Sequence, residues 1–349
     1  MADIIKPHMA SRKPGEDAIQ QKKQEKDDEF RYVKAVNDSK ILWVLLFALF
    51  LLYMVFKSMF VAAGAALMII IIVGLEIWIG VKTGGLGGEV KEMALAIIVA
   101  LVIWYGAGFL LNTPSPLDAV VSCSMVPALE RGDMLLLQGG EVSAPLVNMT
   151  GAEWDMVRQK GLPGQKCAVC RSETTDSACL IDGNGTVVMP DPLFSYGCSL
   201  CERRNAEGQA SYIPCTTEIT VKNRTFKFGT NRRDTIVYAP RPQDPFARSG
   251  EIVHRAQLKV GADGEEYIFT KGDNNNWLDV QIGNMPVVPD RVRGRVIVRM
   301  PYIGYFKLFI SGLFELVQGK ADSGFSLLGD HPECAESFTG TQAIKIDRG

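Results

Sequence analysis

The sequence contains little histidine and has no excess of either charge. Of its 349 residues, three are histidines, and 37 Lys and Arg nearly balance 39 Asp and Glu, which leaves a net charge of −2. This balance indicates neither a nucleic-acid binder nor a polyanion. Because His8 and His331 lie near the two ends of the chain, His254 is the one histidine inside a regular internal segment. Chemistry that needs an imidazole therefore depends on His254.

Ionisable residues are also scarce in the first third of the chain. The stretch 41–81 holds only Lys57 and Glu76, and a further apolar run follows at 94–112. One helix over 41–81 would measure about 62 Å at ~1.5 Å per residue, whereas the hydrocarbon core of a bilayer is about 30 Å thick. We therefore expect a membrane domain, 41–112, with three transmembrane helices at 41–57, 59–81 and 94–112. A turn is expected at Lys57. These runs are too many and too long for a cleaved signal peptide.

The placement of Lys and Arg predicts the orientation in the membrane. Positive side chains precede the first helix and occupy the second connector, whereas residues 113–130 contain none. With three crossings, the charged arm 1–40 is cytosolic and residues from 113 onward lie outside. A single span over 41–81 would place them in the cytosol, but length and charge both argue against it. We expect a multi-pass membrane protein.

Short apolar runs rich in Val, Ile and aromatic residues follow the membrane domain. Gly, Pro and Asp bound each run, which is typical of β strands. The runs are Met134–Leu137, Thr235–Tyr238, Glu251–His254, Tyr267–Thr270 and Val292–Val298. They predict a mainly β domain built from residues 113–140 and 230–300.

Residues 141–229 differ from this pattern and hold six of the eight cysteines. We interpret them as a cysteine-rich insertion. Two Cys-x-x-Cys pairs are typical of a structural zinc site, with Cys167, Cys170, Cys198 and Cys201 as ligands. Cys179 and Cys215 make the count even, and an exterior location favours disulfides over zinc. Either arrangement would staple a segment that has few apolar residues for a core of its own.

An apolar and aromatic segment follows the β domain. It covers 301–318, and its run from Tyr302 to Val317 is interrupted by Lys307 and Glu315. The run is short for a full span, so we expect it to lie at the membrane interface. A buried amphipathic helix is the alternative. Residues 319–349 form a tail.

The segment Ser122-Cys123-Ser124-Met125-Val126-Pro127 is the candidate nucleophile site. Proline disfavours helix in the residue before it, and in extended backbone Ser122 and Ser124 face the same way. A serine hydroxyl needs a base to become a nucleophile, and His254 suits that task. We expect Ser124 to be the nucleophile and Ser122 to assist with an oxyanion. Cys123 as the nucleophile is the less favoured alternative, since such a cysteine is more often buried packing.

Two aspartates are candidates for the acid that orients His254. Asp273 lies in the turn-like stretch Gly272–Asn276, where it could simply cap the turn. Asp279 follows Trp277-Leu278 and could point back toward the histidine. Lys271 offers a Ser–Lys dyad as an alternative, which we favour less because His254 is better placed.

Together these motifs resemble type I signal peptidases, and more narrowly their archaeal and endoplasmic-reticulum branch, which has histidine where the bacterial branch has lysine. The motifs are Ser122–Pro127, Gly132-Asp133, Asp234–Tyr238, Ile252–Arg255, Lys271–Asn275, Asp279 and Pro301–Tyr305. The resemblance covers about 115–140 and 230–310. It departs from the family in Arg233, which stands in a glycine's place, in the three expected helices and in the insertion.

The resemblance implies roles for individual residues. Ser124 would be the nucleophile, His254 the general base, Asp279 the triad acid and Asp273 a supporting acid. It implies a membrane-bound serine endopeptidase with a signal-peptidase-like β fold, without a cofactor, that removes signal peptides from exported preproteins. The expected location is an archaeal cell membrane, and the expected partners are preprotein signal peptides and membrane lipid, with partner subunits undetermined. The alternatives are a membrane serine protease with a narrow substrate set, and an inactive, membrane-anchored binding module.

Overall fold

A computed structural model describes residues 14–338, apart from 57, 85, 162–163, 172–173, 206, 330, 332–333 and 335. The chain divides into two compact units, Met1–Ile98 and Val99–Gly349. Each unit is described by itself.

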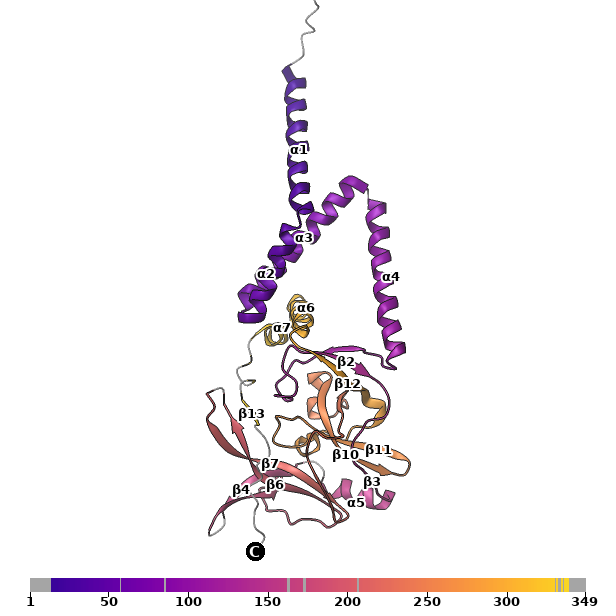
Figure 1. The fold of residues 1–349 in the computed structure, drawn as a ribbon, viewed down its shortest axis with the longest axis vertical. Coiled ribbons are helices and arrows are strands. Elements are labelled where there is room, and N and C mark those ends of the chain that lie inside the picture. Colours follow the sequence, from indigo (N-terminus) through magenta and orange to yellow (C-terminus); the bar gives the residue numbers. More distant parts are fainter. Residues whose placement is uncertain are drawn as a thin grey trace, which may run out of the picture. The chain divides into compact units, whose positions relative to one another are not determined.

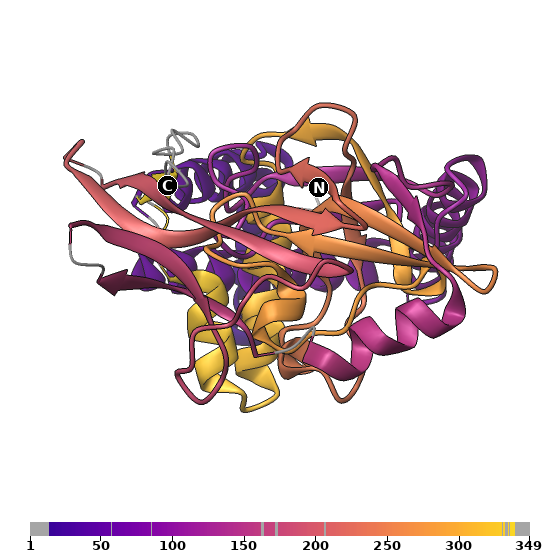
Figure 2. The ribbon, with the colours of Figure 1, turned by 90° about the horizontal axis from the view of Figure 1, so that it is seen from below.

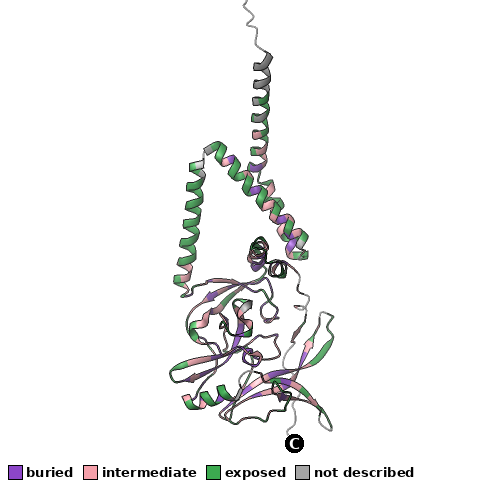
Figure 3. Cartoon of the chain, turned by 180° about the vertical axis from the view of Figure 1, so that it is seen from behind, coloured by how far each residue is buried: buried purple, intermediate pink, exposed green. Residues whose placement is uncertain are grey.

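The first unit consists of helices. They are α1 (Pro14–Asp38), α2 (Ile41–Phe56), α3 (Met59–Gly84) and the start of α4 (Leu86–Leu110), which continues into the second unit. α2 and α3 are apolar on every side, and Trp43 of α2 donates its indole N–H to Glu76 of α3 over 3.3 Å. Figure 3 shows α4 exposed along almost its whole length. A helix that is apolar all round is typical of a membrane span.

Two helical segments are long and apolar enough to cross a membrane, Phe60–Thr83 and Val90–Leu110. α2 has 16 residues, or about 24 Å at ~1.5 Å per residue, which is shorter than a hydrocarbon core. It reaches spanning length only together with the end of α1, Asp27–Asp38, from which it is bent by 47°. The described residues therefore contain two candidate spans, or three if this bent pair counts as one. Lys57, where the sequence predicts a turn, lies outside the described residues.

The second unit is mostly β, as the sequence predicts, and carries four disulfides. Three lie in the insertion, where the sequence favours disulfides, and the fourth, Cys123–Cys334, is not predicted. Its larger sheet has seven strands in the order β1-β2-β12-β9-β10-β11, with β3 parallel to β10 and the other pairs antiparallel. The strands are β1 (Leu117–Ala119), β2 (Met134–Gln138), β3 (Leu146–Asn148), β9 (Thr235–Tyr238), β10 (Ile252–Ala262), β11 (Glu265–Lys271) and β12 (Val292–Met300). Figure 1 labels most strands of this sheet.

The cysteine-rich insertion forms separate hairpins that pack on the larger sheet. It contains α5 (Gly151–Gly161), β4 (Lys166–Arg171), β5 (Asp176–Ile181), β6 (Phe194–Arg204), β7 (Ala210–Val221) and β8 (Arg224–Lys227). Tyr196 and Ile219 of the β6–β7 hairpin share one buried cluster with Leu258 of β10 and Phe269 of β11. Figure 2 shows the long hairpins of the insertion in the same view as the larger sheet. The insertion thus shares a core with the larger sheet, which explains how it folds with few apolar residues.

The last described residues return to the body of the second unit. α6 (Gly304–Val317) and α7 (Ala321–Leu328) pack on each other, and β13 (Ser337–Phe338) adds to the edge of β6. Cys334 forms a disulfide with Cys123. The tail is therefore fixed covalently beside the candidate nucleophile.

Candidate active site

Two kinds of contact hold the turn that carries Ser124: a backbone hydrogen bond from Asn274 and the burial of Met125 in an apolar cluster. Met125 is fully buried among apolar side chains of β2 and β9, a burial that contributes about 1.5–3 kcal/mol. The backbone N–H of Asn274 donates to the carbonyl of Ser124 over 2.7 Å. A Cβ at Gly272 would lie 2.6 Å from the same carbonyl oxygen, so this close approach needs glycine.

Ser124, His254 and Asp279 form a continuous hydrogen-bonded chain. Nε2 of His254 lies 3.0 Å from Oγ of Ser124, and Nδ1 lies 2.7 Å from Oδ2 of Asp279. His254 lies near the start of β10, and Asp279 begins a 3-10 helix, Asp279–Ile282. The histidine and the aspartate are both buried. Burial of an imidazole between a hydroxyl and a carboxylate fixes its orientation.

Two further side chains hold Asp279, and sequence reasoning did not identify them. Tyr238 and Thr270 donate their hydroxyls to Oδ2 over 2.8 Å and 2.6 Å. Burial, followed by the nearby Asp279 carboxylate, raises the pKa of Tyr238 well above its usual range, so its hydroxyl stays a donor. Both residues lie on predicted strands, but a sequence does not show which strand faces which.

Asp273, the predicted supporting acid, pairs with arginine and not with the histidine. Arg255 donates through Nε to Oδ1 over 2.8 Å and through Nη2 to Oδ2 over 2.6 Å. This fork-to-fork pair ties β10 to the turn that holds Ser124. The position of Asp273 fits a role in the shape of the site more than a role in proton transfer.

Lys271, the alternative base, lies beside the site without a described hydrogen bond to Ser124. Its ammonium donates to the carbonyl of Gly272 over 3.3 Å. Burial lowers the pKa of Lys271 to about 8, although the Asp273 and Asp279 carboxylates act in the opposite direction. Of the two candidate bases, His254 is the one in contact with the serine.

Ser122 lies next to the candidate nucleophile. Its Oγ is 3.2 Å from Oγ of Ser124, so the two hydroxyls face the same way. Asn275, which sequence reasoning did not single out, brings its amide nitrogen within 3.4 Å of His254 Nε2. Polar groups from two loops therefore surround the reacting serine.

The cysteines pair as disulfides, and the zinc alternative is wrong. Each of its four candidate ligands is in a disulfide: Cys167–Cys198, Cys170–Cys179 and Cys201–Cys215. Among the described residues, no group of three or more His, Cys, Asp or Glu could hold a metal ion. The Cys123–Cys334 disulfide also removes Cys123 as a thiol nucleophile.

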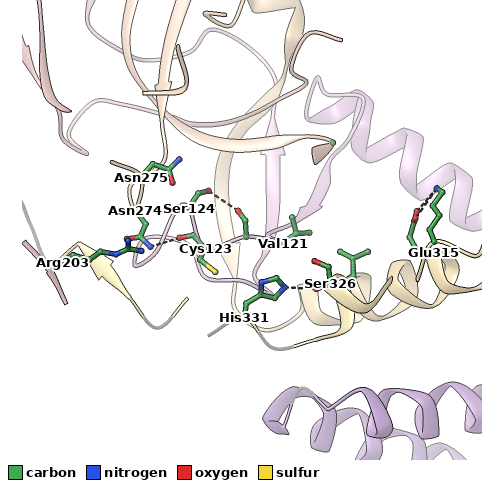
Figure 4. Close-up of a pocket in the computed structure, with 13 residues that line it drawn as sticks. Val121, Cys123, Ser124, Arg203, Asn274, Asn275, Glu315, Ser326 and His331 are labelled. Carbon is green, nitrogen blue, oxygen red and sulfur yellow. Dashed lines mark hydrogen bonds and ion pairs between the residues drawn. The ribbon is translucent and has the colours of Figure 1, made fainter. Parts of the chain in front are cut away.

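An open cavity of about 830 Å³ lies at Ser124. Its lining includes Val121, Ser122 and Gly250, together with Ser326 and Leu327 of α7. Figure 4 shows Ser124 between Asn274, Asn275 and Arg203 on one side and the α6–α7 helices on the other. His331 also lines this cavity, but its Nε2 forms a hydrogen bond with the Ser326 carbonyl oxygen over 2.8 Å.

Ser124, His254 and Asp279 have the relative geometry of a Ser-His-Asp triad, which is recognised by geometry and not by chain order. No protein-family model matches the chain. Over 141 residues, which is 38% of this chain and 78% of the relative, it is 28% identical to the signal peptidase complex catalytic subunit SEC11 of Fusarium vanettenii. It is 27% identical over 135 residues, with the same shares, to that of Metarhizium acridum. Over 52 residues, 15% of this chain and 30% of the relative, it is 40% identical to that of Pyrenophora teres f. teres.

These distant homologues confirm the resemblance to type I signal peptidases of the endoplasmic-reticulum branch. The identity is low, and the matched residues cover little more than a third of the chain.

Proposed function

We propose that this protein is a membrane-bound serine endopeptidase that removes N-terminal signal peptides from exported preproteins. The observation that carries the proposal is the hydrogen-bonded chain from Ser124 through His254 to Asp279. The kinship with signal peptidase catalytic subunits supports the substrate class. The apolar helices support the membrane location.

In the proposed mechanism, Ser124 attacks the carbonyl carbon of the scissile bond while His254 accepts its proton. The imidazolium then gives that proton to the leaving amine, and water repeats the sequence to release the acyl group. Asp279 keeps Nδ1 protonated and stabilises the charged ring. Tyr238 and Thr270 hold Asp279 in place through their hydrogen bonds.

The oxyanion would be held by backbone N–H groups near Ser124 together with the Ser122 hydroxyl. A preorganised donor at this position is worth about 10²–10³ in rate. Ser122 is close enough to Ser124, at 3.2 Å, to reach an oxygen on the attacked carbon. Asp273 acts indirectly, because its pair with Arg255 fixes the turn that carries Asn274 and Asn275.

We further propose that the second unit lies outside the cytosol, with three crossings before it. α6 would then rest on the membrane surface, because Ile303, Ile310, Phe314 and Val317 present an exposed apolar face at helical spacing. The opposite face, which includes Leu308 and Phe309, is buried against the protein. A signal helix in the bilayer would thereby deliver its cleavage segment to Ser124.

Cleavage of a membrane-tethered preprotein by the wild-type protein and by Ser124→Ala, both in membranes, tests the proposal. We expect the wild type to cut after a small residue near the signal helix and Ser124→Ala to be inactive. Equal cutting by both would overturn the assignment of the nucleophile. A panel of unrelated preproteins separates general signal-peptide processing from a narrow substrate set. Absence of cutting by wild type on every substrate would favour the inactive binding module.

A further inference from the structure

A second cavity, of about 310 Å³, lies next to the loop that follows Ser124. Three parts of the chain build it. The loop after the nucleophile contributes Pro127 and Ala128, the insertion contributes Thr217 and Phe228, and the tail contributes Phe338. The motifs that resemble the peptidase family do not include the insertion, so part of the wall of this cavity comes from outside those motifs.

Asn275 connects the two cavities, since it lines both of them. Its amide nitrogen lies 3.4 Å from His254 Nε2, so the place where the two cavities meet lies beside the reaction centre. A peptide that crosses Ser124 therefore has residues before the scissile bond in one cavity and residues after it in the other.

The direction of the peptide follows from which elements line each cavity. Glu315 of α6 and Leu327 of α7 line the first cavity, whereas the insertion lines the second. Figure 1 shows α6 and α7 at one end of the second unit and the hairpins of the insertion at the other. If α6 marks the membrane side, as the proposed function requires, a tethered preprotein reaches the first cavity before Ser124 and the second after it.

The wall made by the insertion is fixed relative to the reaction centre. The backbone N–H of Thr216 donates to the carbonyl of Asn276 over 2.8 Å, and its hydroxyl donates to Gln281 over 2.8 Å. Gln281 belongs to the 3-10 helix that starts at Asp279. β7 is thus joined by hydrogen bonds to the loop that supplies the triad acid.

The wall made by the tail is held by Asn274, which is buried. Its amide donates to the carbonyls of Cys123 and Glu336, over 3.2 Å and 2.9 Å. Its Oδ1 accepts the N–H of Phe338 over 3.2 Å. One side chain therefore connects the nucleophile turn with the strand that carries Phe338.

The charge of the second cavity comes from Lys271, which lies at its edge with Asp273. Both oxygens of Asp273 already accept hydrogen bonds from Arg255. Asp273 is thus already paired with Arg255, and the second carboxylate that acts on Lys271, Asp279, is hydrogen-bonded to His254, Tyr238 and Thr270. Lys271 is therefore the cation of this lining that has no carboxylate hydrogen-bonded to it among the described contacts. Since the pKa of Lys271 is about 8, its amine is mostly protonated at neutral pH. The rest of the lining is mainly apolar, with Phe228 and Phe338 as its largest side chains.

We propose that this second cavity binds an acidic side chain of the preprotein within the first few residues after the scissile bond, with Lys271 as its partner. The stem of that side chain lies against Phe228 and Phe338. The insertion and the tail thereby give the peptidase a preference for the start of the mature protein. This inference rests on the proposed function.

A series of tethered preproteins tests the inference. Ala, Gln, Glu and Lys are placed in turn at each of the first three positions after the cleavage site, and kcat/KM is measured at pH 7. We expect Glu to be favoured over Lys by about tenfold at one position, as for a partly desolvated charge pair. Lys271→Met should abolish this preference while the Ala substrate is still cut. Lys227→Met, an exposed lysine of β8 outside the cavity, is the matched control and should keep the preference.

A second variant covers the case in which Lys271→Met fails to fold. Thr217→Asp puts a carboxylate into the wall made by the insertion, so the preference should shift from Glu toward Lys. If neither variant changes the ratio of Glu to Lys substrates, or if the wild type cuts all four residues equally, the inference is overturned while the peptidase function stands. Failure of the proposed function looks different, because the wild type would then match Ser124→Ala on every substrate.

Discussion

Asp273 and Asp279 are six residues apart and have different partners, which separates their expected roles. Asp279→Asn should lower kcat by about 10³- to 10⁴-fold with little loss of stability, because the amide keeps the shape but favours the wrong tautomer of His254. Single-turnover cleavage of a tethered preprotein measures this loss. A decrease of less than tenfold would contradict the role of Asp279 as the triad acid.

Asp273→Asn is the matched comparison, and we expect it to lower stability more than activity. It leaves the buried guanidinium of Arg255 with a neutral partner, so we expect the free energy of unfolding to fall by about 3 kcal/mol. Activity per folded molecule should fall much less than in Asp279→Asn. Urea unfolding beside the same single-turnover assay separates the two quantities. A stable but inactive Asp273→Asn protein would instead give Asp273 a direct catalytic role.

The lowered pKa of Lys271 predicts how the stability of the protein depends on pH. The folded-state pKa of about 8 lies below the usual lysine value of 10.5, so the unfolded chain binds more protons between these values. Stability should therefore rise with pH from about 8 to about 10. Lys271→Met removes this contribution, so the wild type should gain stability relative to the variant over that range. Urea titrations of both proteins at several pH values measure it. A constant difference would contradict the lowered pKa.

At the residue scale, the sequence identifies a functional side chain when its residue type is rare. It does not identify one whose role depends on a contact formed in the fold. His254 can be found because the chain has one histidine in a regular internal segment. Tyr238 and Thr270 cannot be found this way, since an ordinary strand residue becomes a partner of Asp279 only through the pairing of β9 and β11 with β10. The pair of Arg255 with Asp273 also depends on that register.

At the scale of elements, the disulfide Cys123–Cys334 makes the tail part of the candidate site. It closes a sequence separation of 211 residues next to Ser124. The double variant Cys123→Ser/Cys334→Ser should lose about 2–4 kcal/mol of stability and should cut all substrates more slowly, because the tail no longer holds the nucleophile turn. Thermal unfolding and kcat/KM on a short free peptide measure the two effects.

The control for this variant is Cys170→Ser/Cys179→Ser. That disulfide lies within the β4–β5 hairpin and closes a sequence separation of nine residues. Neither cysteine lines either cavity. We expect this variant to keep its rate per folded molecule. If the Cys123/Cys334 variant keeps its rate as well, the tail does not position the nucleophile.

The elements differ in how well their sequences predict them. β2, β9, β11 and β12 overlap the short apolar runs of the sequence, because such runs report burial directly. The two Cys-x-x-Cys pairs suggest zinc as an alternative, but they lie on β4 and β6. Residues three apart on a strand point to opposite faces, so each cysteine of a pair has a different partner. Spacing alone does not contain this information.

At the scale of the whole molecule, the sequence predicts an apolar N-terminal part followed by a mostly β part, and the structure has both. The three crossings remain a prediction, since two helical segments reach spanning length by themselves. The number of crossings depends on α2, which is apolar enough for a span but has only 16 residues. With a cytosolic N-terminus, three crossings place the second unit outside the cytosol, whereas two crossings place it in the cytosol.

The exposed apolar face of α6 predicts a difference between the cleavage rates of membrane-tethered and soluble substrates. Replacing Ile310 and Phe314 with Asp adds two charges to an exposed apolar face and should weaken its contact with lipid. Ser124 would then no longer be held at a fixed height above the bilayer. Cleavage of a tethered preprotein should fall by tenfold or more, while cleavage of a soluble peptide with the same cleavage site should change by less than twofold. Both rates are measured on the same reconstituted vesicles, with Lys227→Met as the surface control. Equal loss on both substrates would mean that α6 supports the fold and not the approach to the membrane.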